Sequence, residues 1–241
     1  MNRKNIPRLF FNKELKKDLK LKLEKADQHY LKIVLRLIKD DKVKLFNGFN
    51  GEWEAKIDDH KTTTLKCIKK IKDQKNEDGP SLCFSLIKNT SLRWMIEKAT
   101  ELGVNKFYPI ISERSNNKHF NEKKALAHIK EACEVSERLT IPVLEKVNTL
   151  ERILEKTMKN SDTLIFCNET RKDQFLHCYL SNNKKKNISL LIGPEGGFSS
   201  LEEKTIKSYK HVVPVKLFNR LIKAETAAIM ALSIFNGFQK K

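Results

Sequence analysis

The chain has 241 residues, enough for one large domain or two modest ones, and it carries 48 Lys and Arg against 30 Asp and Glu. The resulting formal charge of +18 favours a polyanionic partner, nucleic acid first and a membrane surface second. A lysine-rich composition unrelated to function is the alternative explanation. A hydrophobic content of 39% predicts a packed core and excludes a disordered basic tail.

Cysteine and histidine spacing predicts no metal site and no disulfide framework. The five cysteines form no C-x-x-C pair, and the six histidines form no H-x-x-x-H pair. The first residues lack an apolar signal core, and no run reaches the length of a membrane span. We therefore expect a soluble, cytoplasmic protein with reduced cysteines.

Residues 1–73 predict a small β-rich domain. Strands are expected at 9–11, 42–46, 52–57 and 62–68, with a helical segment at 29–36. Asn47-Gly48 and Asn50-Gly51 are turn signals, and short strands joined by tight turns favour a small barrel. The polar stretch 72–80, which ends in Gly-Pro, predicts a linker.

Residues 81–241 alternate between strand and helix patterns. Strands are expected at 81–87, 106–110, 143–144, 163–167, 188–192 and 212–215. Helices are expected at 92–103, 121–138, from about 149, near 174–180, from about 200 and at 224–238. This alternation predicts an α/β domain with a mainly parallel sheet.

The stretch 188–203 is the most informative in the chain. A five-residue apolar strand stops at a glycine turn, Gly193–Gly197, and Ser199 or Ser200 followed by Glu202 or Glu203 predicts a capped helix. A glycine turn at the carboxyl end of a strand is where open α/β sheets bind ligands. A plain strand-to-helix connection is the alternative. The sequence contains no P-loop and no G-x-G-x-x-G motif.

A second segment, residues 217–228, opens the last helix. It combines two cations, an acid and a hydroxyl in Arg220, Lys223, Glu225 and Thr226. An acid in the first helical turn is favoured by the helix dipole, so a charged helix start is the alternative to a functional site.

Together, residues 191–198 and 220–227 resemble the RsmE family, enzymes of the SPOUT class that use S-adenosylmethionine to methylate N3 of a uridine in 16S rRNA. Segments 6–8, 29–36, 97–104 and 131–138 resemble the family in the same order. The resemblance implies a PUA-like β-barrel at 1–73, and a SPOUT domain at 81–241 with a trefoil knot over roughly 163–241. It also implies a homodimer that acts on the small ribosomal subunit.

The resemblance assigns cofactor binding to two loops, with a third wall after the strand that ends at Cys167. The residues are Leu191, Ile192, Gly193, Pro194, Glu195, Gly196, Gly197, Leu217, Leu221 and Ile222.

Roles for the polar residues follow from spacing and resemblance. Arg220 or Lys223 would stabilise the negative charge that develops on the uridine as N3 loses its proton. Glu225 would orient that cation or accept the N3 proton, and Thr226 would form a hydrogen bond with the base. RNA binding is assigned to Arg3, Arg8 and Arg36, each of which has a solvated surface charge as its alternative.

Three positions depart from the family pattern and bear on substrate contacts. Phe218 stands where a glycine is common, Lys223 replaces a second arginine, and Val135 replaces a glutamine.

Two other functions remain open: a SPOUT methyltransferase for tRNA or 23S rRNA, and a non-catalytic basic RNA-binding or ribosome-assembly protein. The barrel and the Glu-Thr-Ala segment argue against the first, and the departures mildly favour the second.

Overall fold

The computed structural model describes residues 6–59, 64–115, 117–170, 172–183 and 187–239. The chain divides into two compact units, one of residues 1–77 with 133–141 and one of 78–132 with 142–241. The first change of unit falls inside the linker that the sequence predicts at 72–80. The return of residues 133–141 to the first unit had no signal in the sequence, since helix α3 (Glu122–Val135) runs through that boundary.

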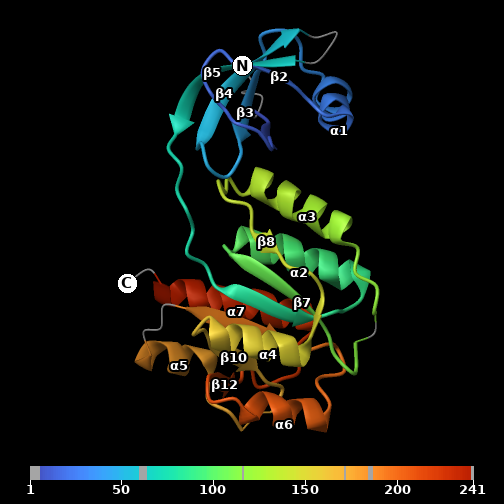
Figure 1. Cartoon of the computed structure of the whole chain (residues 1–241), viewed down its shortest axis with the longest axis vertical. Helices are drawn as coiled ribbons and strands as arrows, with labels where there is room; N and C mark the ends of the chain where they lie inside the picture. Colours follow the sequence, from blue (N-terminus) through green and yellow to red (C-terminus); the bar gives the residue numbers. More distant parts are fainter. Residues whose placement is uncertain (1–5, 60–63, 116, 171, 184–186, 240–241) are drawn as a thin grey trace. The chain divides into compact units, whose positions relative to one another are not determined.

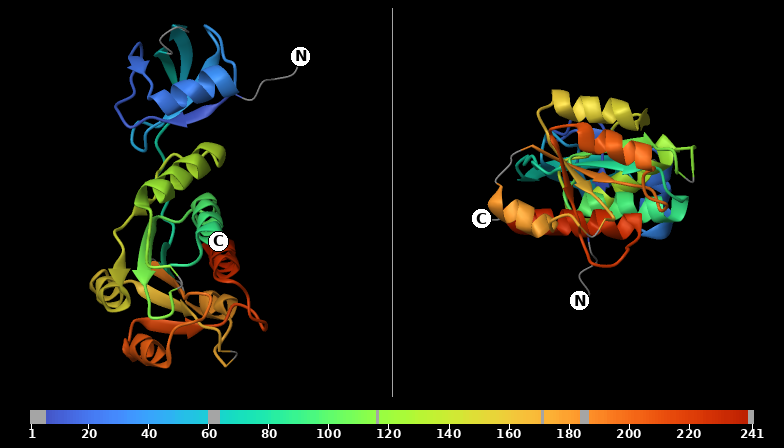
Figure 2. Two further views of the ribbon diagram at one scale, coloured as in Figure 1. Left: turned by 90° about the vertical axis from the view of Figure 1, so that its right-hand side faces the viewer. Right: turned by 90° about the horizontal axis from the view of Figure 1, so that it is seen from below.

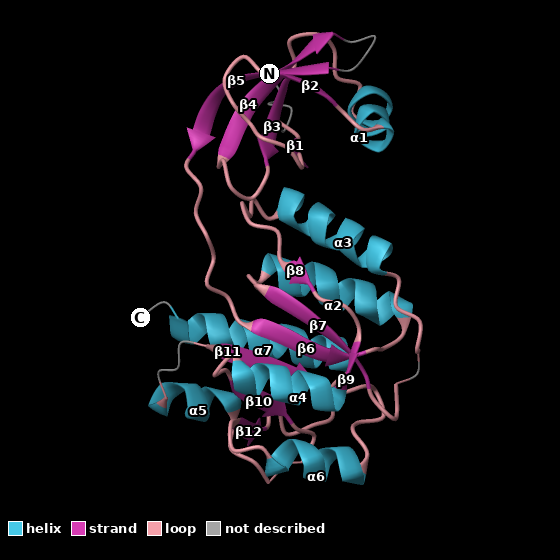
Figure 3. Cartoon of the chain, in the orientation of Figure 1, coloured by secondary structure: helices cyan, strands magenta, loops and turns pink. Residues whose placement is uncertain are grey.

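The first unit is a curled five-stranded sheet in the order β1-β3-β4-β5-β2 (Figures 1 and 3). Its strands are β1 (Arg8–Phe10), β2 (Lys20–Lys22), β3 (Lys42–Phe46), β4 (Glu52–Asp59) and β5 (Thr64–Lys72). Only the β1–β3 pair is parallel. Helix α1 (Lys25–His29) continues into a short π-helical segment, η1 (Tyr30–Val34), within the predicted helical stretch. The three-residue strand β2 has no counterpart in the sequence prediction.

Alternation along β3 explains how this sheet buries a core. Val43 and Leu45 are fully buried, whereas Lys42 and Lys44 lie on the other face. Leu65 of β5 is also fully buried in the same cluster, together with Leu31 of η1. Each such side chain contributes about 1.5–3 kcal/mol on burial.

Arg8 ties the return segment 133–141 to the first unit. Its guanidinium forms an ion pair with the fully buried Glu52, and it donates to the backbone carbonyls of Cys133 and Arg138. The same group lies 3.7 Å from the centre of the Phe46 ring. The prediction that Arg8 binds RNA does not fit this placement, because the side chain is buried and its donors are used inside the fold.

The second unit is a seven-stranded sheet in the order β12-β10-β11-β6-β7-β8, with β9 beside β7, and all of its pairs are parallel. The strands are β6 (Ser81–Ser85), β7 (Lys106–Ile111), β8 (Val143–Leu144), β9 (Asn148–Thr149), β10 (Thr163–Cys167), β11 (Ile188–Ile192) and β12 (Val212–Val215). The predicted parallel α/β architecture is confirmed.

Helices cover both faces of this sheet (Figure 2). Helices α4 (Leu150–Lys159) and α6 (Ser200–Ser208) lie on one face. Helices α2 (Asn89–Glu101), α5 (Leu176–Asn182) and α7 (Ala224–Gln239) lie on the other. All five residues of β11 are buried, which explains why that strand reads as a continuous apolar run. Among the described residues, no helix combines the length and apolar character needed to span a bilayer.

Replacing Arg8 with alanine should destabilise the first unit strongly. The change removes the guanidinium from the buried Glu52 carboxylate and leaves it only the longer contact with Lys72 at 3.4 Å, so we expect the free energy of unfolding to fall by about 3–5 kcal/mol, measured by urea denaturation. Lys42→Ala is the matched control, because Lys42 pairs with Glu54 at 3.0 Å on a half-exposed surface and should cost about 0–1 kcal/mol. Equal effects of the two changes would contradict the structural role of Arg8.

Candidate active site

A cavity of about 270 Å³ lies at the carboxyl ends of β10, β11 and β12. Three chain segments form its walls: 167–169 after β10, 192–195 at the end of β11, and 217–224 after β12. Its lining residues are Cys167, Asn168, Glu169, Ile192, Gly193, Pro194, Glu195, Leu217, Phe218, Arg220, Leu221, Ile222, Lys223, Ala224 and Ala227. The structure thus brings together the two loops and the third wall that the family resemblance implied.

The loop 193–199 is held from several sides. Arg114, which follows β7, donates to the carbonyl oxygens of Gly196 at 3.0 Å and Phe198 at 3.4 Å. Glu195 accepts the backbone N–H of Lys88, just before α2. At the far end Ser199 caps α6 in a reciprocal capping box with Glu202, which is one of the two pairs that the sequence left open. The loop is therefore a fixed wall of the cavity.

Two glycines of this loop lie where a side chain would crowd its surroundings. Gly197 has φ of +65°, and a Cβ at this position would lie 3.3 Å from the carboxylate of Glu169. A Cβ on Gly193 would lie 3.1 Å from the ring of Phe198, a buried residue that packs edge-on against Phe166. The close approach of other groups to the loop backbone explains the glycine turn.

Glu169 brings an acidic group into the cavity wall. Burial, with a smaller contribution from nearby Glu203, raises the pKa of its carboxyl group, and Arg114 opposes that shift. A carboxyl group with this placement can accept hydrogen bonds from a cationic or amino group of a ligand.

The cationic segment presents two charges at the cavity. Arg220 and Lys223 are exposed and line it, and in the described part of the chain neither forms an ion pair. The Arg220 guanidinium lies 4.9 Å from the centre of the Phe218 ring. The departure at position 218 therefore supplies an aromatic face for this arginine.

Glu225 and Thr226 lie outside the cavity. Glu225 Oε1 accepts a hydrogen bond from Ser91 Oγ of α2 at 3.0 Å, and its buried Oε2 has no hydrogen-bond partner among the described residues. Thr226 is exposed in the first turn of α7.

Of the residues predicted to bind a cofactor, most line the cavity. Leu191 is fully buried within β11 instead, and Gly196 and Gly197 shape the loop without lining the cavity. Of the predicted RNA contacts, Arg36 is exposed after η1, Arg8 is buried, and Arg3 lies outside the described residues.

Sequence reasoning missed Arg114 and Ser91, and it expected a wall after Cys167 without naming Asn168 or Glu169. Arg114 and Glu169 each follow the end of a predicted parallel strand, so the rule that ligands bind at carboxyl strand ends could have singled them out. Ser91 carried no such signal, because its contact depends on how α2 packs against α7.

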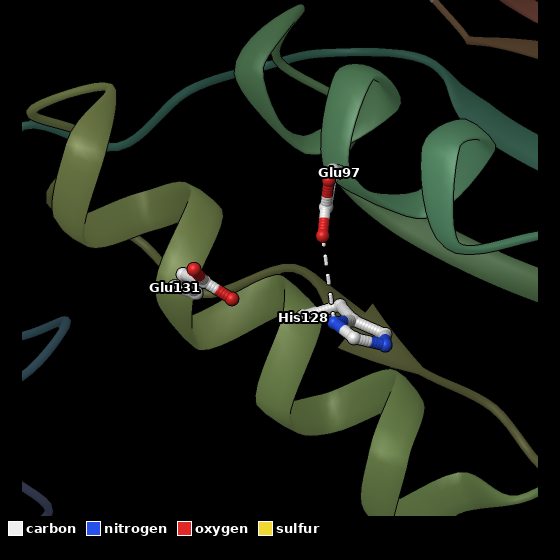
Figure 4. A group of neighbouring side chains, drawn as sticks. All are labelled: Glu97, His128 and Glu131. Carbon is white, nitrogen blue, oxygen red and sulfur yellow. Dashed lines mark ion pairs between the residues drawn. The ribbon is translucent and has the colours of Figure 1, made fainter.

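One group of three metal-ligand side chains lies elsewhere in the described chain: Glu97, His128 and Glu131 (Figure 4). Glu97 already accepts from Arg93 Nε at 2.6 Å and lies 3.5 Å from His128 Nδ1. A bound cation would sit beside the Arg93 charge, so we interpret this group as an ion-pair network.

The RNA methyltransferase domain family matches residues 75–236, and an RNA methyltransferase PUA domain matches residues 23–66. The chain therefore belongs to a family of RNA methyltransferases built from a PUA domain and a parallel α/β domain. Curated relatives narrow this family of RNA methyltransferases to those that act on ribosomal RNA of the small subunit. Ribosomal RNA small subunit methyltransferase E of Rickettsia conorii is 32% identical, over 94% of this chain and 93% of the relative. The same-named protein of Buchnera aphidicola subsp. Schizaphis graminum is 31% identical, over 96% of each chain.

These matches place the chain in the ribosomal RNA small subunit methyltransferase E family. A Legionella pneumophila protein, solved in complex with SAM, superposes with a TM-score of 0.85 at 26% identity, over 97% of this chain and 98% of the other. Methyltransferase E of Neisseria gonorrhoeae superposes equally well, at 21% identity over 97% and 98% of the two chains, which supports the fold alone.

Removing the Arg114 side chain should loosen the loop 193–199. Two charge-assisted hydrogen bonds to the loop carbonyls are lost in Arg114→Ala, so we expect amide hydrogen exchange there to speed up about threefold to tenfold. Hydrogen exchange followed by mass spectrometry measures the effect, with Arg152→Ala on α4 as the control. Exchange equal in both variants would show that Arg114 does not hold the loop.

Proposed function

We propose that this protein transfers a methyl group from S-adenosylmethionine to N3 of a uridine in 16S rRNA. The observation that carries the proposal is the cavity at the carboxyl ends of β10, β11 and β12, which joins a tight glycine loop to a cationic segment. Membership in the methyltransferase E family and the SAM-bound Legionella neighbour support the same reaction. The shared name of the curated relatives favours small-subunit rRNA over tRNA or 23S rRNA.

The residues present fit the cofactor. Ile192, Pro194 and Leu217 supply buried apolar surface, and the absence of a side chain at Gly193 leaves backbone groups within reach of a ligand. The carboxylate of Glu169 complements a positively charged ligand. When bound, S-adenosylmethionine supplies an electrophilic methyl group on a sulfonium.

The chain must then favour loss of the uridine N3 proton. Arg220 and Lys223 bring two positive charges to the cavity, where they would stabilise the anion that develops across N3 and the adjacent carbonyls. Lysine at 223 keeps the charge but donates from a single point, whereas Arg220 offers a planar pair of donors. We therefore assign the principal electrostatic role to Arg220.

Glu225 and Thr226 complete the proposal. Through its bond to Ser91, Glu225 fixes the first turn of α7 against α2, and thereby positions the neighbouring Lys223 at the cavity. In this role Glu225 acts through the position of the helix and does not itself pair with Arg220 or Lys223. We keep Thr226, which is exposed one residue further on, as a hydrogen-bond partner for the base.

The partners follow from the family and from the first unit. We propose that the protein acts in the cytoplasm as a homodimer on the small ribosomal subunit, with the trefoil knot over roughly 163–241. Exposed apolar side chains on α2 and α7, Trp94 and Phe238, suit burial against a second copy. Arg36, which lies in the PUA match and is exposed, is the phosphate contact that we retain there.

Arg220→Ala should reduce methyl transfer by about 10²–10³-fold, because it removes a charge that acts mainly in the transition state. Single-turnover assays with undermethylated small subunits measure the rate, and calorimetry with S-adenosylmethionine should give an affinity close to wild type. Arg152→Ala serves as the control. Near wild-type activity of Arg220→Ala would refute the role of Arg220.

Deleting the gene should remove one methyl group from N3 of a uridine in 16S rRNA, as detected by mass spectrometry of rRNA fragments. Wild-type protein should restore the modification, and Arg220→Ala should restore little of it. An unchanged methylation pattern would instead favour a non-catalytic RNA-binding protein on this scaffold.

A further inference from the structure

A groove of about 1200 Å³, with both apolar and polar side chains in its walls, lies between α2 and α3 in the second unit, separate from the cofactor cavity. Its walls come from the first turns of α2, the loop before α3 and the first half of α3. None of its lining residues was assigned a role from the sequence. Most of them are exposed, so the groove is open to solvent.

Positive charge dominates this groove. Arg93, Lys123 and Lys124 line it against a single acid, Glu122, and the two lysines are exposed. Glu97 pairs with Arg93 and offsets its charge, so the two exposed lysines against Glu122 leave a net charge of +1, which suits contact with phosphates. The groove therefore has the charge expected of a nucleic-acid contact.

The remaining lining suits bases that are not paired. Asn89 and Asn117 supply amide groups, which bond to each other at 3.0 Å, and such groups can bond to base edges. Phe120 is half-buried in the wall, where its ring can stack on a base. Aromatic and amide side chains among cations favour single-stranded RNA, because stacking and edge contacts need unpaired bases.

Glu97 fixes two side chains in the groove wall. It pairs with Arg93 of the preceding turn of α2. It also reaches His128 of α3, as Figure 4 shows. The network spans both helices, so it holds the two sides of the groove together.

The inner end of the groove adjoins the active site. Asn89 and Thr90 line the groove at the start of α2. Their neighbours on either side bond to the catalytic segments: Lys88 through its N–H to Glu195, and Ser91 through Oγ to Glu225. One turn of α2 therefore borders the groove, the glycine loop and the start of α7.

We propose that this groove binds the single-stranded RNA that flanks the target uridine. Lysines 123 and 124 contact its phosphates, Phe120 stacks on a base, and the strand leads along the start of α2 toward the cofactor cavity. The proposal rests on the proposed function for the identity of the RNA, but it concerns a surface outside the catalytic residues.

The test compares two double variants that lose equal charge. Lys123→Ala/Lys124→Ala removes two phosphate contacts, whereas Lys204→Ala/Lys210→Ala removes exposed lysines outside the groove and the cavity. Filter binding to small subunits from the deletion strain, at several salt concentrations, measures affinity. We expect the groove variant to bind about five- to tenfold more weakly at 0.1 M salt. The slope of log affinity against log salt should fall by about 1.4, at about 0.7 per single-strand phosphate.

Phe120→Leu provides a second, uncharged test. It keeps an apolar side chain in the wall but removes the ring, so binding should weaken while the salt slope stays unchanged. For both groove variants, calorimetry with S-adenosylmethionine should give wild-type affinity, and methylation assays should show a raised KM for the subunit with kcat nearly unchanged.

The possible results separate this proposal from the proposed function. Groove variants that match the Lys204/Lys210 control in affinity and slope would overturn the groove assignment even if methylation proceeds normally. Weakened RNA binding in a protein that never methylates would uphold the groove and refute the proposed reaction. A shift in dimer dissociation by sedimentation, with unchanged RNA affinity, would mark the groove as a subunit interface and overturn the proposal.

Discussion

The active site depends on the position of one strand, β10, between β11 and β12. Both pairings are parallel, with Ile165 opposite Leu190 on one side and Val213 on the other. Parallel strands end at the same edge, so the segments that follow the three strands must converge there, although they lie up to about fifty residues apart. The cavity, with the glycine loop and the cationic segment side by side in its walls, follows from this strand order.

Hydrogen bonds and ion pairs between residues far apart in the sequence then hold these segments in place. Arg114 donates to carbonyls of the glycine loop, and Ser91 joins α2 to α7 through Glu225. In the first unit Arg8 plays a comparable part, since its guanidinium gathers Glu52 and two carbonyls of the return segment. In each case a side chain with directional donors determines where a distant segment lies.

Local patterns predicted most elements because each obeys a local rule. The buried run 188–192, one of the capping pairs expected within 199–203 and the strand at 42–46 all appear in the structure. The short strand β2 was missed, because three residues with a single buried leucine carry too little periodicity. Arg8 was misjudged for a related reason: a sequence shows a charge, but not whether an acid such as Glu52 meets it in the core.

The sequence by itself determined the parallel α/β domain, the small β domain before it, and the two motif segments that mark an RNA methyltransferase, because periodicity, glycine turns and helix caps act over a few residues. Only the tertiary structure decided which residues meet. It placed Glu169 beside Gly197, turned Glu225 toward Ser91, and opened a basic groove at Lys123 and Lys124. Such contacts depend on strand order and helix packing, which bring together residues too far apart in the chain for any local pattern to relate them.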